Sequence, residues 1–192
     1  DGSTLFVDYD NQYQLNIPKT WFVIPLSSDD IVDILKRLSK KNPALESTAE
    51  LWAQLDPHVI RVIAVNENKK YIANGYSTNL TITAIEDKLL SSMPLDFVTG
   101  AMEESLKQQG ATLIATQEPT ANNTHGVEIG SFEYQQAAPT ATGGSIQVHA
   151  KALIFQTDGK MIMIQLAVPK QLAKEILPVM DQIKDTIQLV EP

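Results

Sequence analysis

The dipeptide Asp158-Gly159 is the feature of this sequence that most constrains its fold, because it separates two strongly apolar runs. Asp-Gly between two such runs predicts a two-residue β-hairpin of type I′, since both central residues of this turn adopt a positive φ angle. A two-residue turn also sets the register of the strands that it joins. The residues expected to lie opposite one another are Thr157 and Lys160, Phe155 and Ile162, Leu153 and Ile164, and Ile154 and Met163.

Both faces of this hairpin are apolar. Leu153 and Phe155 lie on one face, and Ile154 lies on the other together with Ala152 and Ala150. An antiparallel sheet with one solvated face shows a polar residue at every second position instead. We therefore expect both strands at the centre of a sheet, with helices or loops covering each side.

The rest of the chain predicts one α+β domain over residues 1–192, with neither an internal repeat nor a linker. Alternation of apolar residues indicates further strands within 4–24, 58–66, 79–85, 111–117 and 127–135, with loops at 122–126 and 138–144. Helical spacing and capping residues indicate helices within 27–56, after Pro94 and at about 169–189.

In two of these predicted helices, a single residue should determine where the helix ends or bends. Gly110 should end the helix that begins near Pro94, because glycine adopts the left-handed conformation that follows many helices. Pro178 should kink or divide the last helix, because proline has no N–H to donate. The apolar stripe of the helix after Pro94 is expected to consist of Val98, Ala101, Met102 and Leu106.

Composition argues against several classes of function. The formal net charge of -8 disfavours a nucleic-acid partner and electrostatic docking on an anionic membrane. The chain has no cysteine, which excludes disulfides, thiolate metal sites and a cysteine nucleophile. No apolar run approaches the about 20 residues that cross a bilayer.

The residues that could carry chemistry have simpler structural explanations. Asp8 and Asp10, with Asn11, could offer oxygens to a calcium or manganese ion, but polar turns between strands are common and a calcium loop needs further ligands. No pair of histidines shows the helical spacing of a zinc site, and no Gly-x-Ser-x-Gly elbow is present. We therefore interpret all three histidines as surface or boundary residues: His58, His125 and His149.

The segment 27–56 contains three further candidates. Its acidic group suits a helix N-terminus, where negative charge is favoured by the helix dipole. Its basic group could meet an acidic partner or a lipid head group, but we favour the simpler explanation of solvated charge at a helix C-terminus. Trp52 is either a packing anchor or part of a groove for a partner. The acidic residues are Asp29, Asp30 and Asp33, and the basic residues are Lys36, Arg37, Lys40 and Lys41.

The N-terminal segment resembles the start of Mog1/PsbP-like domains. Their pattern of an aromatic residue, two alternate apolar residues, proline and tryptophan is met by Tyr13, Leu15, Ile17, Pro18 and Trp21. The order of later elements is also similar to that group. The resemblance implies an α/β/α sandwich around an antiparallel sheet, with 27–56 as a helical elaboration. The group includes a photosystem subunit, a nuclear-transport regulator and bacterial lipoproteins, so it shares a scaffold and not a chemistry.

These observations predict a non-catalytic binding or scaffolding domain of the cell envelope, with another protein as partner and no cofactor. The alternative is a protein that binds a small ligand or a metal ion in a pocket between sheet and helices. An enzyme is the third option. The start at Asp1-Gly2-Ser3-Thr4 suggests that a native leader has been removed, so we expect an extracytoplasmic protein, periplasmic or on the cell surface, tethered by a signal or lipid-anchor segment. The oligomeric state stays open.

Overall fold

The computed structural model describes residues 2–25, 58–66, 68–140 and 143–191, together with the helical positions Ile34, Arg37 and Lys40. Arg37 and Lys40, two members of the expected basic group, are exposed. The other residues of the expected helical elaboration at 27–56, including its acidic group and Trp52, lie outside the described residues.

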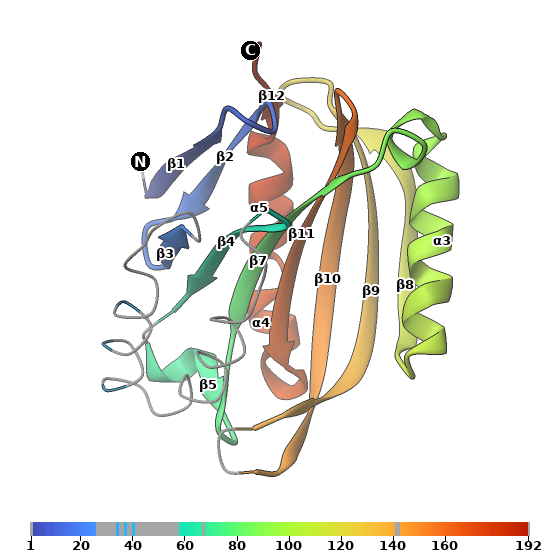
Figure 1. Ribbon diagram of the computed structural model, residues 1–192. Coiled ribbons are helices and arrows are strands. Elements are labelled where there is room, and N and C mark those ends of the chain that lie inside the picture. Colours follow the sequence, from blue (N-terminus) through green and yellow to red (C-terminus); the bar gives the residue numbers. More distant parts are fainter. Residues whose placement is uncertain are drawn as a thin grey trace.

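A seven-stranded sheet forms the centre of the molecule (Figure 1), and every described pair of neighbouring strands in it is antiparallel. The predicted α+β class with a mainly antiparallel sheet is therefore confirmed. In spatial order the strands are β3 (Phe22–Pro25), β4 (Ile60–Val65), β7 (Asn79–Glu86), β11 (Lys160–Pro169), β10 (Ser145–Thr157), β9 (Glu128–Pro139) and β8 (Thr112–Ala121).

The hairpin of β10 and β11 has the predicted register, but the predicted type I′ turn is wrong: Gly159 has φ +73°, whereas Asp158 does not adopt the positive φ that this turn type needs. Phe155 pairs with Ile162 and Ile154 with Met163, and both strands have neighbours on each side. Because successive side chains of a strand point to opposite faces, the register divides the core into two clusters. Leu153 belongs to one of them and Ile154 to the other.

The face with Leu153 is covered by a small second sheet and by the C-terminal helices. The second sheet contains β1 (Ser3–Asp8), β2 (Tyr13–Pro18) and β12 (Gln188–Leu189), and the helices are α4 (Ala173–Ile176) and α5 (Val179–Thr186). Tyr13, Leu15 and Ile17 are fully buried here, as their alternation predicts. Ile176 and Met180 add the apolar side of the helices to the same cluster.

The face with Ile154 packs against α3 (Leu95–Gln108), which bounds the sheet beside β8 and β9. Gly110 follows α3 with φ +88°, as expected of its position. The predicted stripe of α3 is wrong at Ala101, which is exposed. Thr99 and Glu103 are buried instead, because a hydroxyl and a carboxylate find hydrogen-bond partners at Leu95 O and at the Thr116 hydroxyl.

The predicted division of the C-terminal helix near Pro178 is confirmed, but its predicted end at Leu189 is wrong. It consists of a 3₁₀ turn, η4 (Lys170–Leu172), followed by α4 and α5, with the break at Leu177 and Pro178. Ile187 is extended, with ψ 125°, so residues 188–189 form β12 against β2 rather than a last helical turn.

The remaining corrections concern short elements and strand ends. His58 and Val59 lie in a turn before β4, and β9 runs to Pro139 into the segment expected as a loop. Among the described helices, none is long and apolar enough to cross a membrane. The elements without a sequence prediction are η2 (Lys69–Tyr71), β5 (Ile72–Ala73), β6 (Tyr76–Ser77) and η3 (Leu90–Ser92).

Candidate functional site

A pocket of about 430 Å³ lies between the C-terminal helices and strands β9 and β10. The strand side is built by register, because Glu133 lies opposite Lys151 and Gln135 lies opposite His149. Residues paired in this way point to the same side of a sheet. These four polar side chains therefore continue the face on which Leu153 begins the apolar core.

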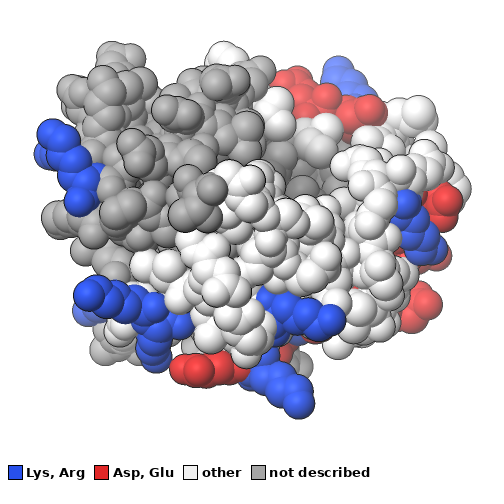
Figure 2. All heavy atoms as spheres, turned by 90° about the horizontal axis from the view of Figure 1, so that it is seen from below, with Lys and Arg blue, Asp and Glu red and all other residues white. Residues whose placement is uncertain are grey.

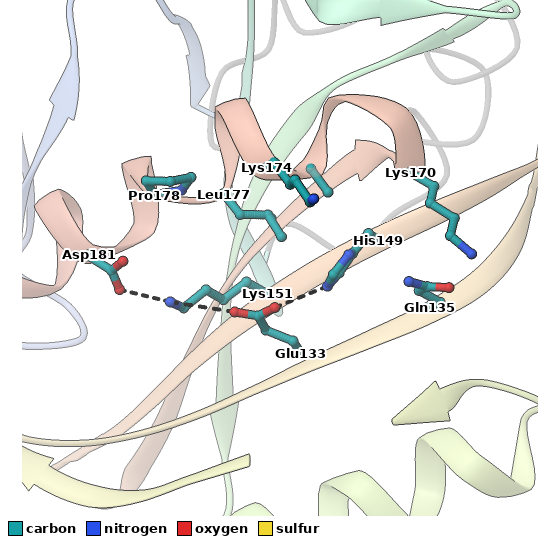
Figure 3. A pocket seen from close by; sticks show the side chains of 10 residues that line it. Glu133, Gln135, His149, Lys151, Lys170, Lys174, Leu177, Pro178 and Asp181 are labelled. Carbon is teal, nitrogen blue, oxygen red and sulfur yellow. Dashed lines mark hydrogen bonds and ion pairs between the residues drawn. The ribbon is translucent and has the colours of Figure 1, made fainter. Parts of the chain in front are cut away.

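The charged side chains on the floor of the pocket contact one another in a row (Figure 3). Lys151 Nζ lies 2.8 Å from Asp181 Oδ1 and 3.7 Å from Glu133 Oε1. The other oxygen of Glu133, Oε2, lies 3.1 Å from His149 Nε2. The side chain of Lys151 is only 7% exposed, and two carboxylates offset the cost of burying its charge.

The helical side of the pocket combines an apolar wall with two lysines. Ala173, Leu177 and Pro178 supply the wall. Pro178 cannot donate the hydrogen bond that would continue α4, so the helix is interrupted here, and Leu177 and Pro178 both line the pocket. Lys170 and Lys174 project from the helical layer toward the strands (Figure 3).

The three histidines have different positions. His149 is half-buried in the pocket, whereas His58 and His125 lie in exposed turns. The interpretation of His149 as a surface or boundary residue therefore missed its contact with Glu133.

The oxygens of Asp8 and Asp10 contact a guanidinium group. Arg61 Nε lies 3.0 Å from Asp8 Oδ2, and Arg61 Nη2 lies 3.0 Å from Asp10 Oδ2. Asn11 Nδ2 also donates to Asp8 Oδ2, at 2.6 Å. Arg61 thus supplies the positive charge that the ion-binding hypothesis assigned to calcium or manganese. Among the described residues, no group of three or more His, Asp or Glu side chains is arranged to hold a metal ion.

Sequence reasoning missed most of the pocket. Lys151 did give a signal, because it is a charged residue in the middle of a strand, directly before the apolar run Ala152 to Phe155. Glu133 and Asp181 gave no such signal, since each lies among residues that suit a solvated position. Their contacts with Lys151 depend on the β9–β10 register and on the path of the chain at Pro178.

Comparison with known proteins identifies the fold. No family model and no curated protein matches the sequence. Three solved structures share its architecture at low sequence identity. Cyanobacterial PsbP (CyanoP) from Synechocystis sp. PCC 6803 is 15% identical with a TM-score of 0.58, and the alignment covers 98% of this chain and 92% of that one.

The other two structures come from different organisms. The Ran-binding protein Mog1p of Saccharomyces cerevisiae is 8% identical with a TM-score of 0.55, over 98% of this chain and 96% of that one. LpqN, involved in cell envelope biogenesis of Mycobacterium tuberculosis, is 12% identical with a TM-score of 0.51, over 98% and 91%. The chain therefore has the Mog1/PsbP-like fold, as the N-terminal pattern predicted.

Proposed function

From this fold and the pocket beneath its C-terminal helices, we propose that the protein is a non-catalytic binding domain of the cell envelope and that the pocket is its contact site. The observation that carries the proposal is the buried ammonium group of Lys151, held between Asp181 and Glu133 on the pocket floor. A buried charge costs stability compared with an apolar core residue, so its presence in a concave site supports a role in recognition.

The chemistry of the pocket favours binding over covalent catalysis. The lining residues include neither Ser nor Thr, and the imidazole and carboxylate groups already contact charged neighbours. A nucleophile needs an adjacent free base and an oriented third group. The pocket instead offers several fixed charges and an apolar wall, which suits reversible binding.

The solved structures support the wider parts of the proposal. Mog1p is a Ran-binding protein, which supports a protein partner for this scaffold. LpqN is involved in cell envelope biogenesis, which supports an envelope location. We also propose the full α/β/α sandwich, supported by α3 against one cluster and by α4 and α5 against the other. A gene that encodes no signal sequence or lipobox cysteine with this domain would contradict the location.

The second candidate function, binding of a small ligand, is favoured by the volume of the pocket. We expect at least one member of a panel of metabolites, short peptides and metal ions to raise the melting temperature. A ligand at 100 times its Kd adds about 2.7 kcal/mol to the free energy of unfolding. Differential scanning fluorimetry measures this shift.

The pocket is tested with two matched variants. Gln135→Trp places an indole in the pocket and should abolish the shift, whereas Gln147→Trp, at an exposed position of β10, should preserve it. A flat response across the panel, or equal shifts in both variants, would contradict the pocket as the contact site.

A further inference from the structure

The lysines on the helical side of the pocket are not balanced by acids. The pocket contains two carboxylates, and both contact Lys151. Among the described residues, Lys170 and Lys174 form no ion pair with any carboxylate. Three lysines therefore stand against two carboxylates in the pocket, an excess of one positive charge in a chain whose formal net charge is -8. Figure 2 shows Lys and Arg side chains, with Asp and Glu side chains beside some of them, at the end of the molecule that is seen from below.

The strand side opposite these lysines adds a neutral donor. Gln135 presents a side-chain amide to the same cavity, and Figure 3 shows Lys170 reaching toward it. Glu133, the nearest carboxylate on that side, is engaged by His149 and Lys151. An anionic group would thus meet two ammonium groups and an amide, while the neighbouring carboxylate of Glu133 is held by Lys151 and His149.

The apolar wall limits the chemistry of the part of a ligand that would lie beyond its anionic group. Leu177, Ala173 and Pro178 line the same cavity as the lysines, and their side chains offer hydrocarbon and no hydrogen bonds. The volume of about 430 Å³ falls within the range of small-molecule sites.

We infer that the pocket binds an organic anion, a carboxylate or phosphate group on an apolar body, with the anion between Lys170 and Lys174 and the body against Leu177. This inference rests on the proposed function of the pocket as contact site and names the chemical class of its ligand.

The experiment compares an anion with its neutral counterpart on the folded protein. Octanoate and octanamide have the same chain and differ in charge, and octyl phosphate and inorganic phosphate complete the set. Isothermal titration calorimetry should give saturable binding of octanoate or octyl phosphate, at least about tenfold tighter than octanamide, because charge-assisted hydrogen bonds are stronger than neutral ones. Tighter octanoate assigns a carboxylate ligand and tighter octyl phosphate assigns a phosphate ligand. Inorganic phosphate should bind more weakly than octyl phosphate because it lacks the apolar body.

Matched variants locate the anion. Lys170→Ala with Lys174→Ala should weaken binding of the anion by about tenfold or more and leave octanamide unchanged. Lys19→Ala with Lys88→Ala removes the same charge from exposed positions and should have little effect. The inference is overturned if octanamide equals both anions, if neither anion binds, or if both double variants behave alike. The contact-site proposal fails separately, if Gln135→Trp leaves the shifts of the wider panel intact.

Discussion

At the scale of single residues, the packing of α3 on the sheet depends on Gly130 of β9. A Cβ atom at this position would lie 2.6 Å from the hydroxyl oxygen of Thr99. That hydroxyl is buried and donates to Leu95 O at 2.8 Å, so it cannot move away without losing its partner. We expect Gly130→Ala to lower the free energy of unfolding by about 1–3 kcal/mol, the usual cost of overpacking. Urea denaturation measures the change.

Gly100, the neighbour of Thr99 in α3, provides the control. A Cβ there meets nothing within 4 Å, so Gly100→Ala should add about 0.5–1 kcal/mol through helix propensity. Adding Thr99→Ala to Gly130→Ala removes the clashing oxygen and should recover part of the loss. Strictly additive losses in that double variant would contradict the steric explanation.

At the scale of secondary-structure elements, α5 ends where a side chain from the β8–β9 connection binds its carbonyl groups. Asn122 Nδ2 donates to Lys184 O at 3.0 Å and to Ile187 O at 2.7 Å. Its Oδ1 accepts from the backbone N–H groups of His125 and Val127. Asn122→Asp replaces the two donated bonds with a buried carboxylate oxygen facing two carbonyls, so we expect a loss of about 3 kcal/mol in urea denaturation.

Asn123, the next residue, is exposed and offers the same substitution without the buried contacts. Asn123→Asp should change stability by no more than about 0.5 kcal/mol. Hydrogen exchange should become faster at the end of α5 in the Asn122 variant only. Equal effects of the two substitutions would mean that Asn122 does not determine where α5 ends.

Elements that depend on local sequence signals could be predicted, and those that depend on distant residues could not. The β10–β11 hairpin could be predicted because its turn and its apolar alternation are local. Asn74-Gly75 is an equally local signal for the β5–β6 hairpin, which the sequence analysis missed. Both residues of that turn have positive φ angles, 51° and 76°. The end of α5 is different, because the Asn122 amide that ends it is 62 and 65 residues away from the carbonyls that it binds. Periodicity carries no information about such a partner.

At the scale of the whole molecule, the fold could be predicted from the sequence, but the pocket could not. The fold could be predicted because both faces of the central hairpin are apolar, which requires cover on each side. The pocket could not, because it forms where the face of Leu153 and Phe155 changes from apolar to charged residues at His149 and Lys151, under the turn at Pro178. Its position is set by the path of the covering helices and not by a motif.

Three tyrosines that pack in or against the core make the free energy of unfolding depend on pH. Burial raises the pKa of the Tyr13 hydroxyl well above its ordinary value, and the charge of Asp8 raises it further. Burial also raises the pKa of Tyr134, with a smaller contribution from Tyr76. The pKa of Tyr76 itself is raised by burial, against the effect of its hydrogen bond with Asn79. Each group is neutral when protonated, so the folded state holds a proton that the unfolded state releases above about pH 10.

The contribution of these tyrosines is therefore fully present below about pH 10 and is lost as the pH rises above it. Each tyrosine should lower the free energy of unfolding by up to about 1.4 kcal/mol per pH unit, so the three together should lower it by at most about 4 kcal/mol per pH unit. Urea denaturation at several pH values between about 9 and 11.5 measures this slope. Tyr134→Phe should reduce it by about a third, whereas Tyr9→Phe, at a position that is 74% exposed, should leave it unchanged. Equal slopes in the two variants would show that the alkaline loss of stability comes from groups other than the buried tyrosines.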